Sequence, residues 1–149
     1  MRKVCGILLA LLVTPVLADE PSCPTSLPPA VEARLLPILE ATRDALRTDK
    51  WDTHSYEAKL DALLAARDSV SVETLVALLD YPISASYSEA ISCHLSVGGP
   101  RTLRLLHLYQ RCDIRPTRSP VARKHPSILR SQTIAEWETS GGKGSCDAD

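Results

Sequence analysis

Cysteine is the residue type whose number and position predict the most chemistry in this chain. The 149 residues contain five cysteines: Cys5, Cys23, Cys93, Cys112 and Cys146. No two of them have the C-x-x-C spacing that often holds a zinc ion, so we expect no metal site. Cys5 lies in an apolar stretch at the start of the chain, and the other four are an even number. An even number of cysteines in an exported protein favours two disulfides.

The other residue types used in catalysis form no recognisable pattern. The four histidines have neither the His-x-x-x-His nor the His-Glu-x-x-His spacing of a zinc site. There is no Gly-x-Ser-x-Gly nucleophile motif, and the glycines at residues 141–144 precede no helical pattern that could bind a phosphate. A pair of carboxylates that cleaves glycans stays an open alternative, because such a pair can be assembled by the fold from residues far apart in the sequence. We expect no catalytic residue and no cofactor, and we rank a cell-wall-acting enzyme below the binding functions.

Cationic residues gather in one segment near the end of the chain. No acidic residue occurs between Ile114 and Ala135, whereas five cations do: Arg115, Arg118, Arg123, Lys124 and Arg130. Three prolines in the same stretch predict a long basic loop over residues 113–126. Such a loop suits docking on an acidic partner protein. The alternative is a solvated loop that balances the acidic first half of the chain. A turn at residues 84–87 is a second candidate docking surface.

The first eighteen residues have the pattern of an export signal. Arg2 and Lys3 precede an uncharged apolar run, and Val16-x-Ala18 is the small-residue pattern that a signal peptidase cuts. The run is too short for a comfortable membrane span. Cleavage after Ala18 removes Cys5 and changes the net charge from −1 to −3. We therefore expect a periplasmic or secreted protein without a membrane span, and no nucleic-acid partner.

Helix signals recur along the first half of the remaining chain. Pro29 is placed to open a first helix, and apolar residues then repeat at intervals of three to four. These residues are Val31, Leu35, Ile38, Leu39, Thr42 and Leu46. Pro37 lies inside this pattern and predicts a kink or a later start. A second helix is expected over about residues 55–67, with an inward face of Tyr56, Leu60, Leu63 and Leu64.

Helix boundaries are clearer in the second half. Ser71 is the expected N-cap of a third helix, and Ser86 and Glu89 have the spacing of a capping box for a fourth. Gly98-Gly99 is expected to end that helix with a positive φ, just before a proline that starts a fifth. A sixth helix is expected over about residues 127–138. The sequence thus predicts an all-α protein, a compact bundle of five to six short helices with two disulfides.

The expected organisation has four parts. They are a signal peptide over residues 1–18, an extended lead-in over 19–27, a helical domain over 28–139 and a tail over 140–149 tethered by Cys146. If the glycines close an antiparallel hairpin, Cys93 and Cys112 are offset by about 10 Å along the helix axes. That offset favours pairing each of them with a terminal cysteine, Cys23 or Cys146. The three connectivities of four cysteines otherwise stay open.

One stretch resembles a known repeat family. Leu75-Val-Ala-Leu-Leu-Asp-Tyr-Pro, Ser88-Glu-Ala-Ile and Gly98-Gly-Pro-Arg-Thr-Leu are similar to a HEAT-type helical hairpin, over about residues 72–109. A single unit implies a compact bundle with HEAT-like packing rather than an extended array. The whole chain also resembles, in design only, the small periplasmic immunity proteins of type VI secretion systems. That resemblance implies a protein-binding module, such as an immunity or inhibitor protein that occludes a secreted hydrolase or toxin. The alternative is a structural or adaptor module.

Overall fold

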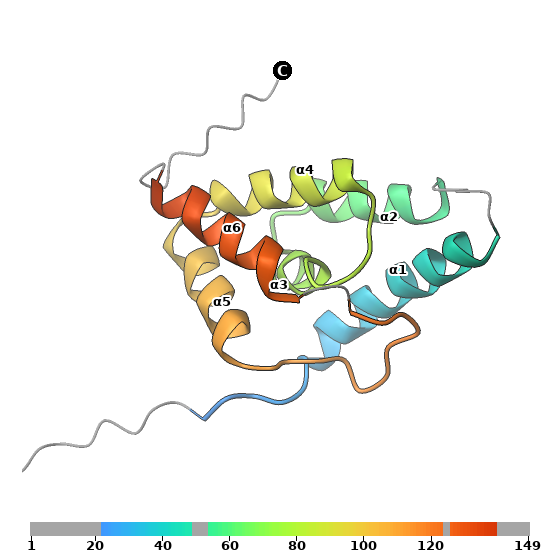
Figure 1. Ribbon diagram of the computed structural model, residues 1–149, viewed down its shortest axis with the longest axis horizontal. Helices are drawn as coiled ribbons and strands as arrows, with labels where there is room; N and C mark the ends of the chain where they lie inside the picture. Colours follow the sequence, from blue (N-terminus) through green and yellow to red (C-terminus); the bar gives the residue numbers. More distant parts are fainter. Residues whose placement is uncertain (1–21, 49–53, 124–125, 140–149) are drawn as a thin grey trace, which may run out of the picture.

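The protein is a bundle of α-helices (Figure 1). A computed structural model describes residues 22–48, 54–123 and 126–139, and these residues form six helices and no strand. The helices are α1 (Pro29–Arg47), α2 (His54–Ala65), α3 (Ser69–Leu78), α4 (Ala85–Ser96), α5 (Gly99–Arg111) and α6 (Pro126–Thr139). The all-α prediction is confirmed. The predicted signal peptide and the predicted tail with Cys146 lie outside the described residues.

Helix α3 forms the centre of the bundle. It packs against α1, α2, α4 and α5, and α6 covers α4 and α5 (Figure 1). Every residue from Thr74 to Tyr81 is buried. A helix without a polar face can only be stable when neighbours surround it, which explains its central place. Within the described residues, no helix has both the length and the apolar character needed to cross a membrane.

Helix α1 begins at Pro29 as predicted and runs without interruption past Pro37. The expected later start is therefore wrong. Five residues of the predicted stripe are buried, but Leu46 is 45% exposed and Ala45 takes its place in the core. The inward face predicted for α2 is confirmed for Tyr56, Leu60 and Leu63, whereas Leu64 is half-buried.

The predicted N-caps of α3 and α4 are wrong. Asp68 caps α3, because its carboxylate accepts a hydrogen bond from the Ser71 amide at 2.8 Å. A carboxylate also suits the partial positive charge of a helix N-terminus, so the helix starts about one turn earlier than Ser71 predicts. Helix α4 begins after Ser84, which makes no side-chain cap bond, and the Ser86–Glu89 capping box does not form its start.

The turn between α4 and α5 needs both of its glycines. Gly99 has a φ of 77°, which confirms the predicted positive φ. Gly98 has an ordinary φ, but a Cβ atom there would collide with the hydroxyl of Thr102. That hydroxyl donates to the Gly98 carbonyl at 3.1 Å, so the Thr102 side chain occupies the space beside the Gly98 Cα atom.

The lead-in segment is fastened to the segment that follows α5. Cys23 forms a disulfide with Cys112, with a Cα–Cα distance of 5.3 Å. This confirms that Cys112 pairs with a terminal cysteine. The Leu27 amide donates to the Arg115 carbonyl at 3.0 Å, beside an isolated parallel bridge. The described residues hold this one disulfide rather than the two expected. Cys93 is not a free thiol.

Candidate functional site

The loop over residues 112–123, which leads from α5 toward α6, contains most of the docking loop predicted over residues 113–126. Its first residues are held by the Cys23–Cys112 disulfide and by the backbone bond to Leu27. Farther along, the Glu32 carboxylate of α1 accepts hydrogen bonds from the Thr117 amide at 2.8 Å and from its hydroxyl at 3.2 Å. A loop without helix or strand is therefore attached to the scaffold at several points (Figure 1).

Arg123 holds the far end of this loop. Its guanidinium group donates to Asp80, to Asp113 at 2.6 Å and to the Ile114 carbonyl at 3.3 Å. The Asp80 side chain is only 2% exposed, and that of Arg123 is 17% exposed. Because Asp80 ends the central helix region, this contact joins the loop to the core of the bundle.

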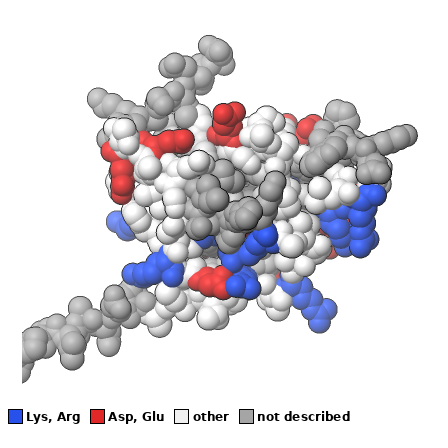
Figure 2. Space-filling view, viewed as in Figure 1, with Lys and Arg blue, Asp and Glu red and all other residues white. Residues whose placement is uncertain are grey.

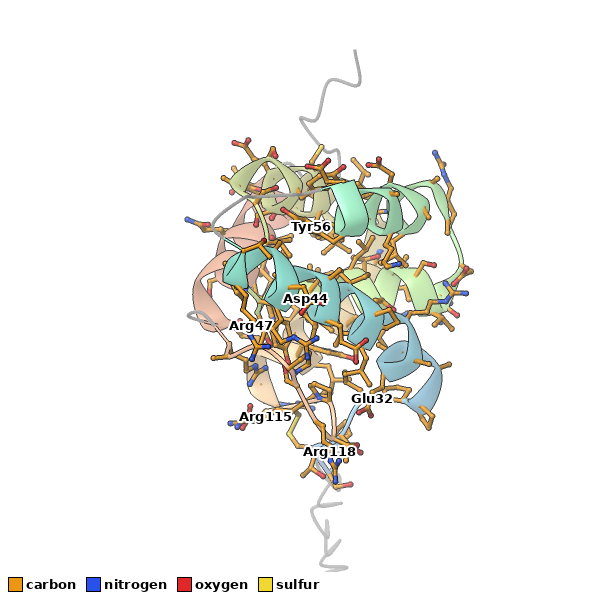
Figure 3. The ribbon with its side chains drawn as sticks, turned by 90° about the vertical axis from the view of Figure 1, so that its right-hand side faces the viewer. Glu32, Asp44, Arg47, Tyr56, Arg115 and Arg118 are labelled. Atoms are coloured by element: carbon orange, nitrogen blue, oxygen red, sulfur yellow. A yellow bond between two sulfur atoms is a disulfide. The ribbon has the colours of Figure 1, made fainter. Side chains whose placement is uncertain are left out.

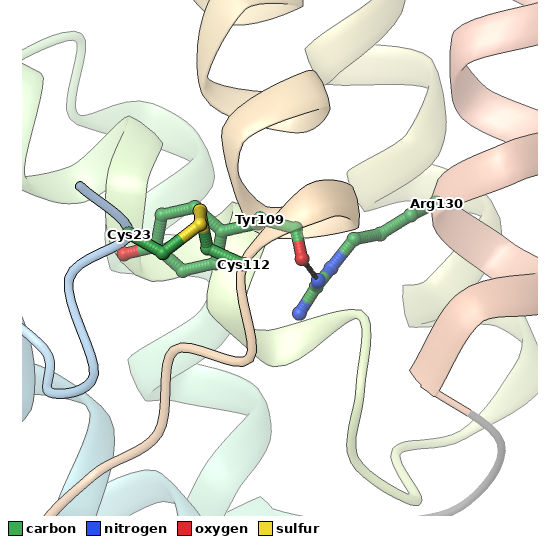
Figure 4. Close-up of a disulfide and its surroundings, with 4 residues drawn as sticks. All are labelled: Cys23, Tyr109, Cys112 and Arg130. Atoms are coloured by element: carbon green, nitrogen blue, oxygen red, sulfur yellow. Dashed lines mark hydrogen bonds between the residues drawn. A yellow bond between two sulfur atoms is a disulfide. The ribbon is translucent and has the colours of Figure 1, made fainter. Parts of the chain in front are cut away.

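Arg130 of α6 donates to the same oxygen of the Asp80 carboxylate, Oδ2, as Arg123 does. Its guanidinium group also donates to the Tyr109 carbonyl (Figure 4). The guanidinium carbon lies 5.3 Å from the centre of the Tyr109 ring. The Tyr109 hydroxyl in turn donates to Glu73 at 3.0 Å. Arg130 is 3% exposed. It connects α6 to α5 and to the end of α3.

We call Asp80, Asp113, Arg123 and Arg130 the Asp80 network. Burial raises the pKa of the Asp80 carboxyl, against the opposite effect of the two guanidinium groups. Burial likewise lowers the pKa of Arg130, against the opposite effect of Asp80. Asp113 is exposed, and hydrogen bonds from Arg115 and Arg123 lower its pKa to about 2. The buried charges are thus costly to desolvate, and each depends on its partner.

The structure divides the five predicted docking cations. Arg123 and Arg130 turn inward and neutralise Asp80, so they belong to the scaffold. Lys124 lies outside the described residues. Arg115 is 60% exposed and pairs with Asp113. Arg118 is exposed and has no hydrogen-bond or ion-pair partner among the described residues. The docking prediction therefore rests on Arg115 and Arg118.

Surface charge is unevenly distributed on the molecule. In Figure 2, acidic side chains gather along the upper left edge, over α4 and α6, and basic side chains over the lower half and the right. Figure 3 shows Arg115 and Arg118 at the lower end, on the loop, with Arg47 of α1 above them. Glu32, which holds Thr117, lies on the same face. The loop thus presents its cations at one end of the protein.

The second candidate surface, the turn at residues 84–87, is partly structural. The Tyr87 hydroxyl donates to Asp61 at 2.9 Å, and its ring meets Tyr56 edge-on at 6.4 Å between centroids. Burial and the neighbouring Asp61 carboxylate raise the pKa of Tyr87 to about 12. Tyr87 therefore fastens α4 to α2.

The structure describes the side chains of two histidines, His94 on α4 and His107 on α5. Burial lowers the pKa of His94, with a smaller effect from the nearby Arg67 cation. The His107 ring lies 3.6 Å from a Glu138 oxygen on the surface. No group of three or more His, Cys, Asp or Glu side chains that could hold a metal ion occurs among the described residues.

Comparison of the chain with protein-family models, with curated proteins and with solved structures finds no match. The HEAT-like and immunity-protein resemblances therefore stay predictions.

The sequence reasoning missed Asp80. Its signal is an acidic residue directly after Leu75-Val-Ala-Leu-Leu, where a buried helix ends. A carboxylate in that position is buried with its helix and needs a cation nearby. Two arginines of the basic segment supply that charge.

Proposed function

We propose that this chain is an exported protein-binding module that docks on an acidic surface of a partner protein through the loop over residues 112–123. One observation carries the proposal: the loop is fixed at both ends, yet Arg118 within it is exposed and unpaired among the described residues. A binding loop held in one conformation loses less conformational entropy when it meets its partner. Rigid scaffolds that present such loops are a common way to build a binding site.

Arginine suits recognition of a carboxylate. Its planar guanidinium group can donate two parallel hydrogen bonds to the two carboxylate oxygens. Most enzymes that cleave glycans work with a pair of carboxylates in their active-site cleft. An inhibitor of a cell-wall hydrolase would complement that cleft with a protruding cation. We therefore favour an immunity or inhibitor role over a purely structural or adaptor role.

The proposal includes export and a second disulfide. The sequence at residues 1–18 supports cleavage after Ala18, and the Cys23–Cys112 bond is compatible with an oxidising destination. With Cys5 removed and Cys23 paired to Cys112, the remaining cysteines of the mature chain are Cys93 and Cys146. We propose that they pair. Peptide mapping under non-reducing conditions should find a Cys93–Cys146 peptide, and a Cys93 thiol that alkylates without reduction would refute this pairing.

Affinity capture with the mature chain tests the proposed function. The oxidised chain, immobilised through its C-terminus, is exposed to bacterial periplasmic extract without reductant. We expect it to retain a stoichiometric hydrolase and to inhibit that enzyme on purified peptidoglycan. Arg118→Glu should weaken retention by about tenfold or more, equal to about 1.4 kcal/mol. Arg104→Glu, an exposed site on α5, makes the same charge change away from the loop and should have no effect.

The outcomes separate the candidate roles. Capture of a hydrolase that Arg118→Glu prevents and Arg104→Glu does not supports the inhibitor role. Equal capture by all three proteins would place the interface elsewhere. A captured partner without enzymatic activity would favour the adaptor role instead.

A further inference from the structure

We infer that the cavity beside the Asp80 network is a binding site for a small oxyanion of the size of inorganic phosphate. The cavity has a volume of about 170 Å³ and lies between the end of α5, the start of the loop and α6. Arginines at three positions line it, Arg111, Arg123 and Arg130, together with the polar side chain of Gln110. This site is independent of the proposed docking function.

Two arginine side chains that line the cavity carry hydrogen-bond donors without an acceptor in the described part of the chain. The Nε atoms of Arg123 and Arg130 are buried and have no hydrogen-bond partner among the described residues. The other nitrogens of these guanidinium groups are engaged by Asp80, Asp113 and backbone carbonyls. Buried donors are nearly always satisfied in folded proteins, and a buried N–H without an acceptor costs free energy. Both donors belong to side chains that line the cavity, and the buried Asp80 Oδ1 atom of the same network also has no partner among the described residues.

The residues around the cavity carry more positive than negative charge. Arg111, Arg123 and Arg130 bring three positive charges to the cavity wall, and Arg115 adds a fourth through Asp113. Asp80 and Asp113 supply two negative charges. Asp113 itself lines the cavity, but Arg115 and Arg123 engage both of its oxygens. Even with Glu73, which accepts from Tyr109, the cations outnumber the acids by one. The site therefore favours an anion.

The size of the cavity and its access to solvent indicate which ligands it can hold. A volume of about 170 Å³ accommodates a phosphate, a sulfate or a single carboxylate group. Gln110 and Arg111 are exposed, so they form the side of the cavity next to solvent. An oxyanion there would accept hydrogen bonds from guanidinium groups, which bind phosphate with two donors at a time.

Titration of the oxidised mature chain with inorganic phosphate tests the site. Ionic strength is held constant with sodium chloride, and the Nε–H signals of Arg123 and Arg130 are followed by NMR. We expect both signals to shift with one saturable curve and the thermal midpoint to rise with phosphate concentration. Arg111→Gln should weaken binding by about tenfold, because it removes one charge at the exposed side of the cavity. Arg104→Gln on the same helix is the matched control and should bind as the wild type does.

A parallel titration with acetate distinguishes the source of the oxyanion. Binding of phosphate much tighter than acetate identifies a free inorganic or phosphoryl ligand. Comparable binding of both identifies the ligand as any small free oxyanion, carboxylates included. Linear, non-saturable shifts with both salts, or unchanged phosphate affinity in Arg111→Gln, would overturn the inference. None of these outcomes depends on Arg118, so the test fails or succeeds separately from the docking proposal.

Discussion

The Cys23–Cys112 disulfide should provide a large share of the stability of this fold. The bond closes a loop with a sequence separation of 89 residues. Loss of chain entropy from the unfolded state upon closing a loop of that length amounts to about 4–5 kcal/mol at 25 °C. A domain of this size has a total stability of about 5–15 kcal/mol. Replacement of both cysteines by alanine is therefore expected to bring the protein close to its unfolding threshold.

Urea unfolding followed by circular dichroism measures this effect. The Cys23→Ala/Cys112→Ala variant should lose about 4–5 kcal/mol of unfolding free energy relative to the oxidised wild type. Cys23→Ala alone keeps the buried Cys112 side chain but breaks the crosslink, and it should lose nearly as much. A loss below about 1 kcal/mol in both variants would contradict a stabilisation that comes from closing this long loop. It would mean that the contacts of Leu27 and Glu32 hold the lead-in and the loop without the crosslink.

Three further predictions concern the network and the glycine turn. Asp80→Asn leaves the buried Arg130 guanidinium without its counter-ion and Arg123 with Asp113 alone, and it should cost about 3–5 kcal/mol in urea unfolding. Asp44→Asn, at an exposed pair, should leave stability nearly unchanged, and equal losses in the two variants would contradict the network's role. Gly99→Ala places a Cβ at a φ of 77° and should lower the free energy of unfolding by about 1–2 kcal/mol. A thermal midpoint equal to that of the wild type would contradict this prediction. Asp113 has a folded pKa of about 2, below the usual 3.8, so its ionised form contributes stability above about pH 4 that is lost as the pH falls toward 2. The difference in thermal midpoint between wild type and Asp113→Asn should therefore disappear between pH 5 and pH 2, and a constant difference would count against it.

The sequence predicted the features that depend on local chemistry. Pro29 opens α1 because the first helical position needs no N–H, and Gly99 takes the positive φ that other residues avoid. The offset expected between Cys93 and Cys112 in an antiparallel hairpin favoured a terminal partner for Cys112, and the structure pairs it with Cys23. The N-cap of α3 was misplaced because Asp68 and Ser71 are both good capping residues within one turn.

The candidate site depended on contacts that no local pattern reveals. Asp80 meets Arg123 and Arg130 across 43 and 50 residues of sequence. The sequence gives no reason to distinguish among the five cations of the basic segment. Only the three-dimensional structure separates the two that neutralise a buried carboxylate from Arg115 and Arg118, which lie on the surface.

The most direct test of the central claim is a charge swap across the interface. Once a partner is captured, the affinity of wild type and of Arg118→Glu is measured against the wild-type partner and against a variant with one acidic cleft residue changed to lysine. We predict that each single change weakens binding by about tenfold or more and that the double change restores most of the affinity. If the affinity losses of the two single changes add in the double change for every acidic residue of the cleft, docking through Arg118 is contradicted.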